Sequence, residues 1–309
     1  MNVLVTGAYG FVGTNLCRFL AERGHSCAAL DIVRGEAPYA SFYTWDQLTE
    51  IPWASFDAVV HLAGKAHDTK NASAPQSYFD INLGLTQKVF ASCGGKVRRF
   101  VFFSSVKACA DTVDGVLTEE TPCAPATPYG QSKLAAETYL RGQATSATDL
   151  YILRPAMIHG PGNKGNLNLL CKVVRHGLPW PLGAFENERS FTSIGNACAV
   201  VEALCAGKCP SGTYQLADDT PLSTTRLIEL IAEASGRKTK IWRVPVGPVR
   251  CVAKAGDWLH LPLNEERLKK LTESYVVSNA KLKRALGWET MPISAEDGMK
   301  ASLASLLCE

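Results

Sequence analysis

Three closely spaced glycines near the N-terminus constrain the fold of this chain more than any other feature. Gly7, Gly10 and Gly13 lie between a short apolar run at residues 3–5 and a segment with helical spacing of apolar residues at 12–23. The first glycine permits a tight turn, the second lets a pyrophosphate approach the backbone, and the third allows close packing of helix on strand. The helix start also offers unpaired N–H groups and a partial positive charge. We therefore expect a dinucleotide-binding turn made by Gly7, Gly10, Phe11, Val12 and Gly13.

Strand-like apolar runs alternate with helix-like segments through the first half of the chain. The expected strands are residues 3–5, 27–30, 58–62, 99–103 and 150–153, and the expected helices are 12–23, 82–92 and 133–140. This alternation, with strands that are apolar throughout, predicts an α/β fold with a Rossmann-type doubly wound parallel sheet covered by helices on both faces. Such a sheet binds its ligand at the carboxyl ends of its strands.

The second half of the chain predicts a smaller C-terminal substrate-binding lobe. A breaker-rich loop begins at His159, and the strand expected at 213–216 is placed to rejoin the sheet. Further helices are expected at 167–175, 227–235 and 280–286. We therefore assign residues 1–165, with 190–220 rejoining them, to the cofactor domain, and residues 166–189 with 221–309 to the lobe.

Composition excludes several other classes of protein. The 309 residues include 32 Lys and Arg against 29 Asp and Glu and are 46% hydrophobic, which argues against a disordered chain and against a basic nucleic-acid-binding module. No window approaches the roughly 18 apolar residues of a membrane span, and the N-terminus lacks the basic run of a signal peptide. Eleven cysteines without a C-x-x-C pair predict buried, reduced thiols. We expect a cytoplasmic protein with no membrane partner and, because no histidine pair has ligand spacing, no metal.

Asp31 ends the second expected strand, 18 residues after Gly13. A carboxylate there can accept hydrogen bonds from both ribose hydroxyls and repels a 2′-phosphate, which favours NAD over NADP. Arg34 lies close enough in the sequence to weaken that preference, and an ordinary turn residue is the alternative interpretation of Asp31. Ile32 belongs to the same candidate cofactor site.

A tyrosine and a lysine are spaced for acid–base chemistry. Tyr129 and Lys133 are four residues apart at the start of an expected helix, so both side chains lie on one face. A free phenol has a pKa near 10, and we expect the nearby ammonium and an oxidised nicotinamide to favour the phenolate. Ser104 and Ser105 end the fourth expected strand, where a hydroxyl can bond the same reacting oxygen. Each pattern alone also fits an exposed helix face or a turn, but their order behind the glycine turn favours catalysis.

With these motifs the chain resembles the extended short-chain dehydrogenase/reductase family, which includes nucleotide-sugar epimerases and dehydratases. The resemblance covers nearly the whole chain. It is carried by the glycine turn, His61–Gly64, Asn82 with Gly84 and Thr86, Phe103–Ser105, Tyr129 with Lys133, Leu153–Pro155, Gly160–Gly162, Arg189–Asn196 and Leu286–Trp288.

The resemblance implies a set of cofactor contacts. Leu62, Ala63 and Gly64 would line the cofactor with their backbone, and Asn82 would support the strand beside it. Lys133 would bond the nicotinamide ribose, and Pro155 would pack on the nicotinamide carboxamide. The cofactor implied is NAD, with Ser105, Tyr129 and Lys133 as the catalytic residues and Ser104 beside the cofactor.

The resemblance also implies a UDP-sugar substrate. Arg189 would pair with the diphosphate, for which a guanidinium has fitting geometry, although a surface charge is the alternative. Trp180 and Leu182 lie in the segment whose backbone holds uracil in related enzymes, and Asn166 matches a polar residue near the diphosphate. Lys107 follows the strand that carries Ser105, so we expect it at the mouth of the site, with an exposed loop lysine as the alternative.

The residues after Ser105 narrow the reaction. The 4,6-dehydratases of this family carry Asp-Glu at the two positions that are Val106 and Lys107 here, so dehydration is rejected. A 4-epimerase needs no further acid–base group, and a 4-keto reductase uses the same residues with added reduced cofactor. Asp31 favours tightly held NAD and hence the epimerase. Against the epimerase, Met157 stands after the fifth strand where the family frequently has an asparagine, so both reactions stay open.

Two other classes of protein fit the sequence less well than a nucleotide-sugar enzyme. A non-catalytic NAD-sensing regulator tends to lose the tyrosine or the lysine, and this chain keeps both. Reductases of steroid or flavonoid carbonyls usually prefer NADP and have an apolar substrate lobe, and Asp31 and Arg189 argue against that class. Relatives often form homodimers through two helices beside the catalytic one, so a homodimer is expected, with no nucleic acid partner.

Overall fold

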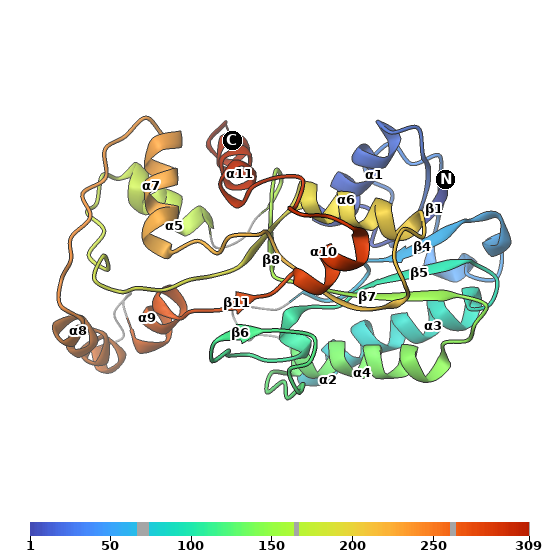
Figure 1. The fold of residues 1–309 in the computed structure, drawn as a ribbon, viewed down its shortest axis with the longest axis horizontal. Helices are drawn as coiled ribbons and strands as arrows, with labels where there is room; N and C mark the ends of the chain where they lie inside the picture. Colours follow the sequence, from blue (N-terminus) through green and yellow to red (C-terminus); the bar gives the residue numbers. More distant parts are fainter. Residues whose placement is uncertain (67–73, 164–166, 260–263, 309) are drawn as a thin grey trace.

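Seven parallel strands form the central sheet of the protein (Figure 1). The computed structural model describes residues 1–66, 74–163, 167–259 and 264–308. The strand order is β10-β7-β5-β4-β1-β2-β3, and its direction of growth reverses between β1 and β4, where doubly wound sheets bind their ligands. The predicted Rossmann-type fold is therefore confirmed. The strands are β1 (Asn2–Thr6), β2 (Ser26–Leu30), β3 (Ser41–Tyr43), β4 (Ala58–His61), β5 (Arg99–Phe103), β7 (Asp149–Pro155) and β10 (Gly212–Leu216).

Helices cover both faces of this sheet. Alternate residues of a strand point to opposite faces, so Val3 and Val5 of β1 pack in one core and Leu4 packs in the other. All three side chains are fully buried, and each such burial stabilises the fold by about 1.5–3 kcal/mol. The covering helices are α1 (Phe11–Ala21) and α6 (Ile194–Cys205) on one face, and α3 (Gly84–Cys93) and α4 (Pro128–Gln143) on the other (Figure 1).

A second apolar core lies in a helical lobe at the other end of the molecule (Figure 1). Ile228, Met299 and Leu303 are fully buried in it, and Trp180 and Leu182 pack with them. The helices that contribute to this core are α5 (Leu167–Arg175), α7 (Thr224–Ala234), α8 (Val246–Leu259), α9 (Glu265–Thr272) and α11 (Ala295–Cys308).

Two short parallel pairings connect distant parts of the chain. β8 (Met157–His159) pairs with β9 (Phe191–Ser193), and β6 (Val116–Leu117) pairs with β11 (Val276–Val277). α10 (Ala280–Leu286) contacts β10, and its Leu282 packs, together with Met291, in the core of the sheet domain that contains Val3 and Val5. Residues 280–291 therefore pack with the sheet domain, although the sequence assigns them to the lobe.

The ten cysteines from Cys17 to Cys251 are free thiols. Most of them are buried, as expected, but Cys123 is half-buried and Cys251 is exposed on α8. None of the helices in the described part of the chain is long and apolar enough to cross a membrane.

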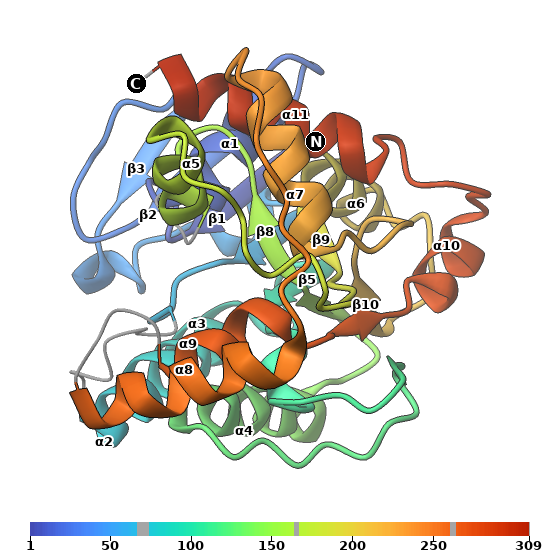
Figure 2. The ribbon, with the colours of Figure 1, turned by 90° about the vertical axis from the view of Figure 1, so that its left-hand side faces the viewer.

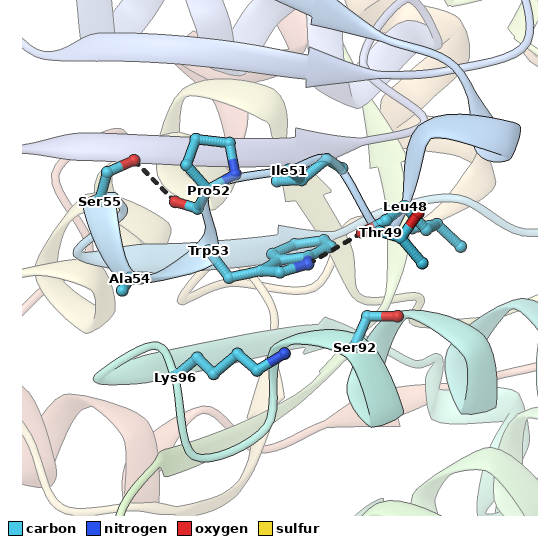
Figure 3. Close-up of a pocket in the computed structure, with 9 residues that line it drawn as sticks. All are labelled: Leu48, Thr49, Ile51, Pro52, Trp53, Ala54, Ser55, Ser92 and Lys96. Carbon is cyan, nitrogen blue, oxygen red and sulfur yellow. Dashed lines mark hydrogen bonds between the residues drawn. The ribbon is translucent and has the colours of Figure 1, made fainter.

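A surface hollow lies at the amino end of the sheet and is separate from the predicted site (Figure 3). The indole N–H of Trp53 donates to the Leu48 carbonyl at 3.1 Å, and the Ser55 carbonyl accepts a hydrogen bond from the side chain of Asn2, at the start of β1. Since doubly wound sheets bind ligands at the carboxyl ends of their strands, we assign this hollow no role in the reaction.

Candidate active site

The glycine-rich turn has the geometry expected of a pyrophosphate cradle. Gly7 has a φ of +65°, and a Cβ atom there would lie 2.7 Å from the backbone nitrogen of Ala63. A Cβ atom on Gly13 would lie 2.4 Å from the carbonyl oxygen of Ala8, so helix α1 packs directly on the turn. Gly10 caps α1 and has no side chain to occupy the first N–H groups of the helix, which include those of Phe11 and Val12. The turn therefore fits a dinucleotide phosphate.

Asp31 is held beside this turn by two backbone hydrogen bonds. Its Oδ2 accepts the N–H of Tyr9 at 2.9 Å, and its Oδ1 accepts the N–H of Ile32 at 2.7 Å. Each oxygen keeps lone-pair capacity for a ribose hydroxyl. Ile32 and Val33 next to it are 77% and 70% exposed, which leaves an apolar surface beside the carboxylate.

Ser105 and Tyr129 come together at the carboxyl edge of the sheet. Ser105 follows β5, while Tyr129 lies in the first turn of α4, whose N-cap Thr127 accepts the N–H of Gly130. A hydrogen bond joins the side chains of Ser105 and Tyr129. Lys133, one turn further along α4, donates from Nζ to the carbonyl of Phe103 at 2.9 Å. The three predicted catalytic residues thus lie together at the end of β5.

Burial is the largest cause of the pKa shifts in this group. It raises the pKa of Tyr129, and the hydrogen bond to Ser105 opposes this. Burial also lowers the pKa of Lys133 to about 8, against the attraction of Glu137. Within the chain itself, desolvation of the phenolate therefore outweighs the hydrogen bond from Ser105.

The lowered pKa of Lys133 predicts a pH dependence of stability. Its usual value is 10.5 and its folded value is about 8, so between these pH values the unfolded chain binds the additional proton. The free energy of unfolding contributed by this lysine therefore rises with pH across that window. Chemical denaturation at several pH values should show that Lys133→Met removes part of this rise. An identical pH profile in both proteins would contradict the assigned pKa.

Asn82 connects the end of β4 with helix α4. It lies in a π-helical turn (Phe79–Leu83) that follows α2 (Pro75–Tyr78). Its Oδ1 accepts the N–H of Lys65 at 2.7 Å, and its Nδ2 donates to the hydroxyl of Ser132 at 2.9 Å. Asn82 therefore fixes the backbone that follows β4 to helix α4.

Gly64 keeps the space between β4 and α4 open. A Cβ atom on Gly64 would lie 2.8 Å from Asn82 Oδ1 and 3.2 Å from Lys133 Nζ. Leu62 and Ala63 hold the preceding backbone in place, because their N–H groups donate to the carbonyl and hydroxyl of Thr6. Pro155 lies buried at the end of β7, in register with Leu216.

His61 is a structural residue. Its ring is fully buried between the hydroxyls of Thr6 and Thr86, at 2.6 Å and 3.0 Å. Burial, together with the charge of Lys133, lowers the pKa of His61 to about 3, so the ring is neutral at physiological pH.

A buried carboxylate behind the catalytic group was missed by the sequence analysis. Glu137 is fully buried and receives both arms of the Arg154 guanidinium, at 2.9 Å and 2.6 Å. Arg141 adds a contact at 2.7 Å. The hydroxyl of Ser104 donates to Glu137 at 2.5 Å, so Ser104 belongs to this cluster. The i, i+4 spacing of Glu137 from Lys133 is the signal that could have found it.

Lys107 and Arg189 approach each other at Tyr275. Lys107 lies in a short 3₁₀ turn (Val106–Ala108), and its Nζ donates to the Asp111 carbonyl at 2.6 Å, 4.4 Å from the centre of the Tyr275 ring. Arg189 donates to the Lys270 carbonyl, and its neighbour's N–H pairs with the Tyr275 carbonyl. Burial lowers the pKa of both cations, and the charge of Arg189 also lowers the pKa of Lys107. Two half-desolvated positive groups at one place suit a diphosphate. Tyr275 had no signal in the sequence.

The predicted uracil segment is wrong at Trp180. Its N–H donates to the Lys240 carbonyl and its carbonyl accepts the N–H of Trp242, both at 2.8 Å, so its backbone is already paired. The Trp180 and Leu182 side chains are each 4% exposed in the core of the lobe. The reason is a pairing between residues 60 apart in the chain, which local patterns do not reveal. Asn166 lies outside the described residues.

Among the residues that the structure describes, no three His, Cys, Asp or Glu side chains are grouped so that they could hold a metal ion.

Comparison with known proteins agrees with this geometry. The chain is 29% identical to a UDP-glucose 4-epimerase of Vibrio cholerae, covering 99% of this chain and 95% of that protein. It is 28% identical to the N-acetyl-alpha-D-glucosaminyl-diphospho-ditrans,octacis-undecaprenol 4-epimerase of Escherichia coli O157:H7, covering 79% and 75%. The structure of Bordetella bronchiseptica WbmG in complex with NAD matches with a TM-score of 0.76 at 19% identity, covering 100% of this chain and 94% of that one.

The sequence model of one family matches residues 3–207, which hold the glycine turn, Asp31 and the Ser105–Tyr129–Lys133 group. An NAD-dependent enzyme needs those features, and the residues described above fit that cofactor. The chain therefore belongs to the NAD dependent epimerase/dehydratase family.

Proposed function

We propose that this protein is an NAD-dependent 4-epimerase that acts on a UDP-hexose or UDP-N-acetylhexosamine through a 4-keto intermediate. The observation that carries the proposal is the hydrogen-bonded Ser105–Tyr129 pair with Lys133 at the end of β5. Both curated relatives described above are named for sugars attached to a diphosphate. The cations Lys107 and Arg189 supply complementary charge on this chain.

The residues of the site divide the work of the first step. Tyr129 takes the proton of the sugar C4 hydroxyl, and Ser105 holds the same oxygen by a hydrogen bond. Lys133 supplies positive charge beside the phenol, and the buried surroundings strengthen each of these interactions. The glycine turn and Asp31 would hold NAD, which would supply a reversible hydride acceptor for the hydrogen at C4.

The second half of an epimerisation makes few demands on the protein. The keto sugar must present its other face, so the site should hold the diphosphate firmly and the sugar loosely. Lys107 and Arg189 are suited to hold the diphosphate. Val106 and Lys107 provide no acid and base for the loss of a C6 hydroxyl, which disfavours dehydration.

Thermal unfolding tests the substrate class. A ligand that binds only the folded protein stabilises it, by about 2.7 kcal/mol when the ligand concentration is 100 times its Kd, and therefore raises the melting temperature. We expect UDP-glucose or UDP-N-acetylglucosamine to raise it, and UMP with free sugar to raise it less. The absence of a shift with any UDP-hexose or UDP-N-acetylhexosamine would count against the proposal.

Lys107→Ala tests the diphosphate contact. Loss of a charge-assisted hydrogen bond should raise KM about tenfold or more, with a smaller fall in kcat, because the contact is present before and during the reaction. Lys281→Ala is the matched control, since Lys281 also lies over a tyrosine ring, that of Tyr214 at 5.5 Å, away from the site. An unchanged KM in Lys107→Ala would reject this role.

Asp31→Ala tests the choice of cofactor. Loss of the carboxylate should weaken NAD binding about tenfold and affect NADP less, because the repulsion of a 2′-phosphate is lost with it. Titration of both cofactors, followed by quenching of tryptophan fluorescence, gives the two dissociation constants. An unchanged ratio between NAD and NADP affinities would show that Asp31 does not read the ribose.

We further propose that the protein forms a homodimer and supplies precursors of surface polysaccharide from the cytoplasm. The catalytic helix α4 and its neighbour α3 lie side by side on one face of the sheet, and this pair can form a four-helix interface with a second copy. Light scattering at several concentrations should give twice the monomer mass of 33.3 kDa.

A further inference from the structure

Helix α8 carries a second apolar face that nothing in the described structure covers. Its buried face is Val249, Ala253 and Gly256, which pack inward beside α9. Val246 is half-buried on the same side of the helix. Five other apolar residues fall on another arc, which spans about 120° at 100° per residue. All five are exposed, Trp258 at 81% and Val252 at 55%. The members of this exposed arc are Pro248, Cys251, Val252, Ala255 and Trp258.

Positive charge is concentrated around the exposed arc. Residues 237–270 carry nine Lys and Arg against three Asp and Glu, whereas the whole chain has 32 against 29. Arg250 and Lys254 lie along one edge of the arc on α8 itself, and both are exposed, as is Asp257 beside them. The neighbouring helix α9 adds three more exposed cations, Arg267, Lys269 and Lys270, of which Lys269 and Lys270 form ion pairs with Glu273 and Glu266.

The exposed arc lies at an end of the molecule that can approach a surface. In Figure 1, α8 is at the end of the molecule opposite β1 and α1, and in Figure 2 it lies in front of α9. The same helix α9 borders the candidate site, because the Lys270 carbonyl accepts a hydrogen bond from Arg189. A partner at α8 would therefore lie near the proposed diphosphate contacts.

We propose that helix α8 docks on the surface of an anionic lipid bilayer. An amphipathic helix with a tryptophan on its apolar arc and lysine or arginine beside it fits the boundary between headgroups and acyl chains. The indole ring is suited to that boundary because it has an apolar body and a polar N–H. This partner departs from the sequence expectation of no membrane contact, which considered only spanning segments and leaders.

The charge distribution disfavours a second copy of the chain as the occupant. A two-fold interface brings the same surface of both copies together, so the cations Arg250 and Lys254 of one copy would lie near those of the other in a patch of net positive charge. The exposed arc contains only one large aromatic ring. A bilayer needs no complementary pocket, and its anionic headgroups attract the cations.

Co-sedimentation with vesicles tests the proposal on the full-length protein. We expect binding to vesicles with about 40% phosphatidylglycerol in phosphatidylcholine, and at least about tenfold weaker binding to pure phosphatidylcholine. About 0.5 M NaCl should weaken binding severalfold, because it shortens the Debye length. Trp258→Ser should lower the partition coefficient about tenfold by removing the apolar anchor. No binding to the anionic vesicles would overturn the proposal.

Paired charge variants make the test specific to α8. Arg250→Glu with Lys254→Glu should abolish most of the binding, whereas Arg98→Glu with Lys208→Glu, an equal charge change at exposed sites of the sheet domain away from α3 and α4, should preserve most of it. Equal losses in both would reduce the effect to net charge and reject the proposal. Normal vesicle binding by the Trp258→Ser protein would also reject the proposal. A change in its oligomeric mass alone, with vesicle binding unchanged, would reject it as well. Melting curves check the fold, and the assay needs no substrate, so its failure is separate from failure of the proposed function.

Discussion

Tyr129→Phe is expected to lower turnover by about 10²–10⁴-fold while NAD still binds. The substitution removes only the phenolic oxygen, which Ser105 bonds and which is placed to take the sugar proton. The ring stays, so its edge contact with Tyr78, with centroids 6.2 Å apart, is kept. Single-turnover measurements of NAD reduction, together with an NAD dissociation constant, separate chemistry from binding.

A second tyrosine on the same helix provides the control for that experiment. Tyr139 also lies on α4 but packs against the core of the sheet domain, ten residues from Tyr129. Tyr139→Phe should leave turnover within about twofold of the parent. Full activity in Tyr129→Phe would contradict the proposed proton transfer, whereas a loss in both variants would indicate damage to the helix.

Glu137→Gln is expected to lower the free energy of unfolding by about 3–5 kcal/mol. The change removes the charge but nearly preserves the shape, so Arg154, only 3% exposed, would remain buried without its counter-charge. Water cannot readily replace a bidentate partner at 2.9 Å and 2.6 Å in this position. Urea denaturation of the protein without cofactor measures the effect.

Arg141 supplies a matched control for the buried pair. It contacts the same carboxylate at 2.7 Å, but its side chain is 43% exposed. Solvent screens such a pair, so Arg141→Ala should cost no more than about 1 kcal/mol. If Glu137→Gln and Arg141→Ala destabilised the protein equally, burial would not be what makes Glu137 important.

Local patterns explain which parts of the fold could be predicted. The glycine turn and Asp31 depend on residues close in the sequence, and the structure places them as expected. α6 was missed because it is buried almost all round, from Ile194 to Cys205, and so has no amphipathic period. Strand β3 was missed because three residues at a sheet edge give too short a pattern.

Long-range pairing explains the errors at the site. The partners of Trp180 are 60 or more residues away, so the sequence could not show that its backbone is occupied. Tyr275 joins Lys107 and Arg189 only through pairings with distant segments. The Tyr129 pKa depends on total burial, which a four-residue motif does not report. The reacting groups could be identified from residues close in the sequence, whereas their surroundings depend on residues far away in the chain.

Incubation with UDP-glucose or UDP-N-acetylglucosamine deuterated at C4 tests the central claim most directly. NMR of the products, with NAD and without added NADH, should show the C4 epimer with its deuterium retained, because the same hydride leaves and returns. An unlabelled epimer would contradict the direct return of hydride. No epimer from either sugar, together with reduction of a UDP-4-keto-6-deoxy sugar only when NADH or NADPH is added, would contradict the epimerase and identify a reductase.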